Sequence, residues 1–228
     1  AIGNGFANLT DLTSIGDVAT NGSISTLNNQ TYLANVTLAG NTTLTGNDVT
    51  FTKGVVGAGN NLTLNFAQTI AIDSGIAGVG NLTSVGNVTL AGTVATIGAQ
   101  DYQADATLTA ATTIQGTTAN FSGGLTGNGQ DLSLNLSGGA VIDSQIAGVA
   151  NLTAISDVSI NGTVTTSGSQ TYQANATLIG NSTLTGSAGT FAAGVIGGGN
   201  DLTLNFAGTT SLDGSFANLA DLTSVGDV

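Results

Sequence analysis

The sequence predicts an all-β fold, a right-handed parallel β-solenoid (β-helix) in which the chain winds around a long axis in about three coils per 70-residue repeat. The 228-residue chain is built from a 70-residue repeat that recurs without a gap, and such a period is typical of stacked units that bury their apolar faces on one another. Thr, Val, Ile, Asn and Gly dominate, and these are residues of strands and turns. Short runs of alternating apolar and polar residues are separated by Gly, Asn, Asp and Ser, which is the pattern of short strands joined by turns.

The period divides the chain into three complete units and two partial ones, without an internal domain boundary. The last partial unit matches the start of the first complete unit at seven of eight positions. We therefore expect one continuous array over 1–228, excerpted from a longer array whose capping units are not part of this segment. In order, the units are 1–10, 11–80, 81–150, 151–220 and 221–228.

The charge of the chain excludes several classes of partner. Charged residues make up 6% of the chain; all 13 acids are Asp, and Lys53 is the only base, so the formal net charge is −12. A basic stripe for nucleic acid cannot be built from one Lys. No apolar run approaches the roughly 18 residues of a membrane span, so we expect neither nucleic-acid binding nor membrane insertion. The chain has no Cys and hence no disulfide framework.

One repeat unit divides into three stretches that each begin with alternating apolar residues. In the third unit these stretches are 151–176, 177–200 and 201–220. Each has a suitable length for one coil of a β-helix. Because strands are stacked about 4.8 Å apart, three coils predict a rise of roughly 14 Å per unit and a rod of about 45–50 Å.

The aromatic residues fall into repeat-related sets, and we expect each set to stack as a structural column along the axis. All ten aromatic residues belong to four such sets, which is not the scatter expected of ligand contacts. The sets are Tyr32, Tyr102 and Tyr172; Phe51, Phe121 and Phe191; Phe66, Leu136 and Phe206; and Phe6, Ile76, Ile146 and Phe216.

A further repeat-related set consists of the acidic residues Asp73, Asp143 and Asp213. They are the only acids kept in all three units. Units about 14 Å apart place these carboxylates too far from one another to share an ion, whose ligands lie roughly 2.3–2.6 Å away. We therefore expect turn residues that accept hydrogen bonds from local backbone N–H groups.

The chain resembles a known family in the stretch 165–178, Thr-Thr-Ser-Gly-Ser-Gln-Thr-Tyr-Gln-Ala-Asn-Ala-Thr-Leu, and in the following 182–186, Ser-Thr-Leu-Thr-Gly. These runs look like the repeats of filamentous-haemagglutinin-like adhesins, large secreted bacterial proteins of the two-partner-secretion type. The resemblance extends over all three units and implies a right-handed winding, an extracellular or cell-surface location and a role in cell adhesion, as a filament or in biofilms. It carries over no functional residues, because the repeats of that family are chiefly scaffold.

Two acidic residues are candidates for calcium binding. Asp131 and Asp201 follow Gly- and Asn-rich turns similar to the calcium-binding nonapeptide repeat. The apolar residues after Asp131 are out of phase with that motif, and the first unit has Asn61 at the equivalent position. We therefore predict no metal site and no cofactor.

Catalysis lacks its usual side chains. The chain contains no His, Cys, Glu or Arg, so the commonest general base, the thiol nucleophile and the guanidinium clamp are all missing. We predict that the protein is not an enzyme. Asn-x-Ser/Thr triplets are frequent, for example at Asn35, Asn81, Asn151 and Asn175, and these Asn residues are explained as turn formers or stacked amide ladders.

The function that fits these observations is the structural shaft or stalk of an extracellular bacterial adhesin or surface filament. Its expected partners are further repeats stacked end to end, and a host-cell, bacterial-cell or polysaccharide surface bound through domains outside this segment. One alternative is an ice-binding solenoid, suggested by the triplets 43–45, 107–109 and 183–185, each Thr-Leu-Thr. Another is a β-helix that binds or cleaves glycans.

Overall fold

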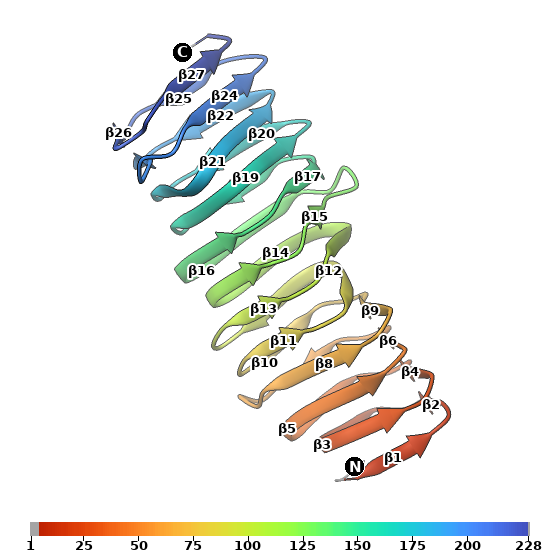
Figure 1. Ribbon diagram of the computed structural model, residues 1–228. Helices are drawn as coiled ribbons and strands as arrows, with labels where there is room; N and C mark the ends of the chain where they lie inside the picture. The colour runs from red at the N-terminus through yellow and green to blue at the C-terminus, as the bar shows by residue number, and fades with distance from the viewer. Residues whose placement is uncertain (1–4, 228) are drawn as a thin grey trace.

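The computed structural model describes residues 5–227 and shows a single continuous β-solenoid without helices (Figure 1). All strand pairings within this range are parallel and belong to one sheet of 27 strands. The predicted all-β solenoid is thereby confirmed, with about 11 coils. The strands are β1 (Phe6–Leu9), β2 (Leu12–Ser14), β3 (Val18–Thr26), β4 (Asn29–Tyr32), β5 (Val36–Gly46), β6 (Asp48–Phe51), β7 (Val55–Val56), β8 (Leu62–Phe66), β9 (Thr69–Ile72), β10 (Ile76–Val79), β11 (Leu82–Ser84), β12 (Asn87–Thr96), β13 (Gln100–Tyr102), β14 (Ala106–Phe121), β15 (Leu125–Thr126), β16 (Leu132–Ile142), β17 (Ile146–Val149), β18 (Leu152–Ala154), β19 (Val158–Thr166), β20 (Ser169–Tyr172), β21 (Ala176–Gly186), β22 (Ala188–Phe191), β23 (Gly194–Ile196), β24 (Leu202–Phe206), β25 (Thr210–Leu212), β26 (Ser215–Ala217) and β27 (Leu222–Val225).

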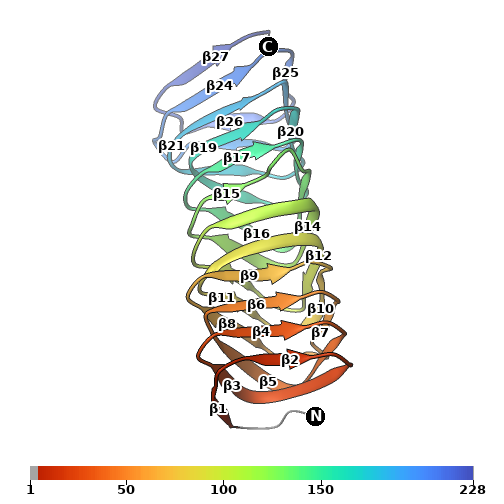
Figure 2. The ribbon, with the colours of Figure 1, turned by 90° about the vertical axis from the view of Figure 1, so that its right-hand side faces the viewer.

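Each coil contributes one strand segment to each of three faces. Face 1 begins with β2, β4, β6 and β9, which lie one above the other in Figure 2. Face 2 begins with the first half of β3 and of β5, then β7 and β10. Face 3 begins with β1, the second half of β3 and of β5, then β8. In Figure 2 the strands nearest the viewer run to the right as the chain climbs from the N-terminus, which is the right-handed sense.

The longest strands bend around a corner and so serve two faces. In β3, β12 and β19 the register with the next coil shifts at the bend, at Gly22, Gly92 and Gly162. These glycines have φ angles of 76°, 72° and 99°, a left-handed conformation that other residues rarely adopt. Part of the difference in coil length is therefore taken up at these corners, and further register shifts lie inside β1, β10 and β17.

The number of coils per repeat is not a whole number. From Tyr32, successive coils lead to Phe51, Ile72, Leu90 and Leu108. Tyr102, the repeat equivalent of Tyr32, lies one strand before Leu108, and a coil has three strands. One repeat therefore spans three and two-thirds coils, and each unit is turned by one-third of a circle relative to its neighbours.

This rotation corrects the predicted division of a unit into the three coils 151–176, 177–200 and 201–220. Between neighbouring coils of face 1, Leu12 pairs with Gln30 and Val49 pairs with Ile70. One circuit is therefore shorter than the two longer predicted stretches, and circuits differ in length. With strands about 4.8 Å apart, one repeat rises by about 18 Å, and about 11 coils give a rod of about 53 Å.

The same rotation separates residues that were expected to stack. Tyr32, Tyr102 and Tyr172 lie on faces 1, 3 and 2, and therefore form no common column. The ring stacks instead join each Tyr to the Phe of the next coil. Tyr32–Phe51, Tyr102–Phe121 and Tyr172–Phe191 have centroid distances of 5.2, 4.9 and 5.0 Å, with nearly parallel planes. The sets of Phe66, Leu136 and Phe206 and of Phe6, Ile76, Ile146 and Phe216 are likewise distributed over different faces.

The core is a continuous column of inward side chains along the whole rod. Alternate residues of each strand point inward, so strands such as Leu62–Phe66 show the burial pattern expected from their apolar alternation. The largest fully buried side chains include the three Tyr and four Phe rings, those of Phe51, Phe121, Phe191 and Phe206. Each coil therefore buries its apolar residues on the coils above and below.

One buried hydroxyl lacks a partner, and we expect its removal to stabilise the protein. Thr210 is 2% exposed, and its Oγ1 makes no hydrogen bond within the described residues. The equivalent position of the first repeat is the apolar Ile70. Thr210→Val should raise the free energy of unfolding by about 1 kcal/mol, because an unpaired buried hydroxyl is unfavourable. Chemical denaturation measures the change.

The control is Thr166→Val, which removes a buried Thr hydroxyl that does have hydrogen-bond partners. Thr166 Oγ1 donates to Gly168 O at 2.9 Å and accepts from Gln170 Nε2 at 3.4 Å. This variant should be destabilised by about 1 kcal/mol or more. Equal effects of the two substitutions would contradict the assignment.

Candidate functional site

The chain repeats one buried polar cluster, formed by a Gln, a Tyr and a Thr, in each unit. In the second unit Gln100 Nε2 donates to Val94 O at 3.0 Å, Gln115 O at 2.7 Å and Thr96 Oγ1 at 3.2 Å. Tyr102 OH donates to Gln100 Oε1 at 2.6 Å. The equivalent contacts recur around Gln30 and Gln170. Because these clusters are closed to solvent and bind their own backbone, they hold neighbouring coils together rather than form a reactive site.

Burial raises the pKa of all three tyrosines far above the ordinary value of a phenol. Removal of the phenolic proton would place a negative charge in the apolar core, which is the physical cause of the shift. The three phenols therefore stay protonated, and the clusters neutral, well above neutral pH.

We expect the protein to lose stability in alkali, and to do so through these tyrosines. Below about pH 10 the phenols are protonated in both the folded and the unfolded state, so they add no pH dependence. Above that pH only the unfolded state loses the protons, and the free energy of unfolding should fall by about 1.4 kcal/mol per pH unit for each Tyr. Tyrosinate absorbance and circular dichroism should then change together.

The control is the triple variant with Phe at positions 32, 102 and 172. It should be less stable at neutral pH but should lack the steep alkaline loss. Tyrosinate absorbance that rises near pH 10 while the circular dichroism remains native would contradict the prediction.

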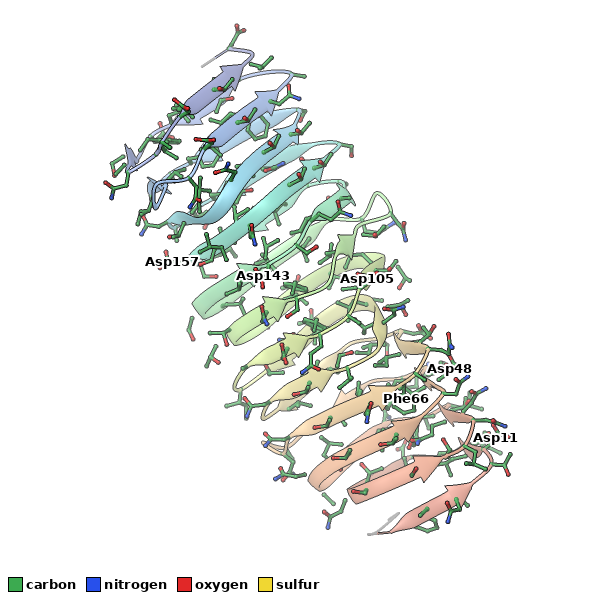
Figure 3. All side chains as sticks on the ribbon, viewed as in Figure 1. Asp11, Asp48, Phe66, Asp105, Asp143 and Asp157 are labelled. Atoms are coloured by element: carbon green, nitrogen blue, oxygen red, sulfur yellow. The ribbon has the colours of Figure 1, made fainter. Side chains whose placement is uncertain are left out.

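Asp and Asn side chains at the corners tie each coil to the next. The carboxylate of Asp17 accepts from Asn35 N at 3.0 Å, and that of Asp105 accepts from Gly124 N at 2.9 Å. Asn61 Oδ1 accepts from Asn81 N at 2.9 Å, and Asn81 Oδ1 accepts from Ala99 N at 2.8 Å. Figure 3 shows the labelled aspartates spread along the rod instead of gathered at one place. Acidic residues such as Asp17 and Asp105 thus stabilise the corners by bonding one coil to the next.

The calcium candidates belong to this corner arrangement. Asp131 Oδ1 accepts from the backbone N and side-chain Nδ2 of Asn151, at 3.0 and 2.9 Å. Asp201 donates its backbone N–H to Asn181 Oδ1 at 3.0 Å. Across residues 5–227, no three acidic side chains gather closely enough to hold a metal ion. The absence of a metal requirement stays a prediction.

The repeated acids Asp73, Asp143 and Asp213 lie on three different corners, which the rotation of the repeat explains. We expected these carboxylates to accept hydrogen bonds from local backbone N–H groups, and among the described residues they do not. Asp143 Oδ1 accepts from Asn161 Nδ2 at 3.2 Å, and Asp213 Oδ2 accepts from Ser211 Oγ at 2.9 Å. These exposed residues form neither a column nor a common site.

The frequent Asn-x-Ser/Thr triplets follow from the geometry of a corner. The Asn of such a triplet ends the corner and bonds to the next coil, as Asn81 and Asn151 do. The residue after it points into the core, and the Thr two positions on points outward. A solenoid with Asn at its corners and Thr on its faces therefore produces these triplets without any need for glycosylation.

Two shallow depressions lie on the surface of the rod, near the coils' corners and faces. One, of about 190 Å³, lies beside Asp131 and Asn151, where Ala111 replaces the corner Asn41 of the first unit. A second, of about 360 Å³, lies over Gly54 and Gly75 on face 2. Both are open and shallow, and neither gathers groups suited to catalysis.

The most regular surface feature was not predicted from the sequence. Outward residues at the centre of face 1 form a column along the rod, with one register shift, inside β17. From one coil to the next it runs through Thr13, Thr31, Thr50, Ala71, Thr89, Thr107, Thr126 and Ala147, and it continues in Thr165, Thr185 and Asn205. The signal in the sequence is the short, nearly even spacing of the first members, which the 70-residue alignment conceals.

The Thr-Leu-Thr triplets that suggested an ice-binding surface are not aligned with one another in the structure. Residues 43–45 lie on face 3, whereas residues 107–109 and 183–185 lie on face 1. The column of face 1 arises mostly from other Thr residues.

Comparisons with known proteins find no matching family model, no matching curated protein and no matching solved structure. The described part of the chain also contains no helix long and apolar enough to cross a membrane.

Proposed function

We propose that this chain is a shaft segment of an extracellular bacterial adhesin or surface filament, of the filamentous-haemagglutinin-like type. The observation that supports this role most strongly is the unbroken stacking of about 11 coils on a single core. In such a rod, reach grows linearly with chain length, by about 4.8 Å for each coil.

Three features suit the segment to bearing load. Parallel ladder hydrogen bonds connect every coil to its neighbours, corner Asp and Asn residues add further bonds, and the buried Gln clusters join three successive strands. The low share of charged residues leaves little repulsion between coils. Attachment itself is assigned to domains elsewhere in the longer protein.

The test uses bacteria that produce the full-length protein, with or without residues 102–171. Electron microscopy should show surface fibres shortened by about 18 Å per deleted unit, with binding to the target surface retained. The isolated 228-residue segment should bind neither host cells, bacterial cells nor polysaccharide. Loss of attachment with fibres of the expected length, or tight binding by the segment alone, would refute the shaft role.

We also expect the isolated segment to associate end to end or to fray at its ends. Leu222 is 45% exposed, whereas its repeat equivalents Leu82 and Leu152 are each 1% exposed beneath another coil. Uncovered apolar residues and unpaired strand edges recruit further strands. Hydrogen exchange should be faster in the first and last coils than in the middle.

Analytical ultracentrifugation gives the second measurement, a sedimentation coefficient that rises with concentration. A strictly monomeric segment whose end coils exchange as slowly as its centre would contradict the expectation.

A further inference from the structure

The central column of face 1 presents hydroxyl groups to solvent at a regular interval. Eight of its first ten members are Thr, and the two others are Ala. Successive members belong to hydrogen-bonded neighbouring strands and therefore lie about 4.8 Å apart. Strand pairings join the members from Thr13 to Ala147, and one register shift, inside β17, lies between Ala147 and Thr165.

The hydroxyls of this column have no partners within the described part of the chain. Inward Thr residues such as Thr96, Thr112 and Thr166 each donate to a backbone carbonyl. The outward Thr89, Thr107 and Thr126 make no such bond, and the same holds for the other outward Thr residues of the column. Their hydrogen-bonding capacity is therefore available to water or to a bound surface.

A second polar column runs beside the first. Two residues before each member of the column from Thr31 to Thr185, about 7 Å across the face, lies a second row of positions, in or just before the same strands, that are mostly Asn, Asp or Thr. They are Asn29, Asp48, Thr69, Asn87, Asp105, Gly124, Gln145, Thr163 and Thr183. Several are fixed by the next coil, since Asp48 Oδ1 accepts from Thr69 N at 3.0 Å and Asp105 Oδ1 from Gly124 N at 2.9 Å.

The chemistry of face 1 restricts what could cover it. A soluble small molecule needs a concave pocket, and the two depressions described above lie on face 2. Sugar rings usually stack on exposed aromatic side chains, yet Phe6 and Phe216, the two rings outside the fully enclosed core, both belong to face 3. Nucleic acid requires cations, and Lys53 is the only one.

We propose that face 1 binds ice. A rigid, flat, two-column array of hydroxyl and amide groups with adjacent methyl groups can hold water in a fixed lattice, and a crystal of water is an occupant with matching extent and regularity. The backbone is already fixed by parallel ladder bonds, so little conformational entropy is lost on binding. This inference is independent of the shaft role.

The test compares two triple variants on overlapping stretches of the rod, displaced from each other by between one and two coils. Thr89→Lys, Thr107→Lys and Thr126→Lys place long charged side chains on three successive coils of face 1. The matched control, Asn120→Lys, Val141→Lys and Ser159→Lys, does the same on face 3. Thermal hysteresis and inhibition of ice recrystallisation are measured for the 228-residue chain, with circular dichroism melts to confirm folding.

The unmodified chain and the face 3 variant should arrest ice growth, and the face 1 variant should lose this activity. If the triple variant of face 1 fails to fold, the single variant Thr107→Lys replaces it. Absence of ice-growth arrest in the unmodified chain would overturn the proposal, and so would equal activity of the two variants. Binding of an insoluble polysaccharide that depends on face 1, without any effect on ice, would overturn it too and assign the face to a glycan instead.

Discussion

Deletion of residues 102–171 should leave a folded, cooperatively melting β protein. The deletion joins Asp101 to Tyr172 and removes one whole repeat. Gln100 then lies two residues before Tyr172 and reaches Thr185 O, which is the carbonyl that Gln170 contacts in the intact chain. Every strand keeps neighbours of the same kind, because the pattern of strand pairing between coils recurs in each unit.

Deletion of half that length should be disruptive. Removal of residues 102–136 joins Asp101 to Ser137 and takes away both Tyr102 and Gln115. Gln100 then loses two of its partners inside the core, and each unpaired buried group costs about 1–3 kcal/mol. We expect this variant to aggregate or to melt without cooperativity.

Circular dichroism melts and small-angle X-ray scattering distinguish the two deletions. The longer deletion should shorten the rod by about 18 Å while the far-UV spectrum keeps its β form. Similar behaviour of both variants would show that the coil register described above is wrong.

Substitution of a buried Gln should have a large effect on the stability of the protein. Gln100→Leu removes the donor to Val94 O and Gln115 O and the acceptor of the Tyr102 phenol. We expect a loss of about 2–4 kcal/mol in the free energy of unfolding, since the remaining polar groups have no water within reach. Chemical denaturation measures this loss.

Gln100→Glu adds a pH dependence with a definite sign. The buried carboxyl group faces backbone carbonyls, so its pKa in the folded state should be raised above its unfolded value of about 4.3. Stability should therefore be highest in acid and should fall as the pH rises past that value. The control is the exposed Gln68→Glu, for which we expect a change within about 0.5 kcal/mol and no such pH profile. A pH-independent Gln100→Glu variant would contradict the role of the cluster.

The fold class was predictable because strand alternation and composition act locally. Runs such as residues 62–66 show by their alternation which side chains point inward, and the structure confirms that pattern. The stacking partner of a strand is set by the number of residues in one circuit, and the 70-residue period does not report this number. To predict which residues pair, one must know where the chain bends at the corners. This applies to Leu12 with Gln30 and to Leu44 with Leu64.

Part of the surface was hidden for the same reason. Alignment by repeats places Thr31 beside Asp101 and Thr171, whereas in space Thr31 lies between Thr13 and Thr50. A shorter spacing was nevertheless present in the sequence. Asn41, Asn61 and Asn81 recur at equal intervals and mark successive corners.

Because the number of coils per unit is fractional, the number of units sets the orientation of one end of the rod relative to the other. Adding or removing one unit changes the length of the rod. It also rotates all later coils by a third of a turn about the axis of the rod. Only a change of three units restores the original azimuth. Recombination between such units would therefore vary the direction in which a distant surface points as well as its distance, while the pattern of strand pairing is kept.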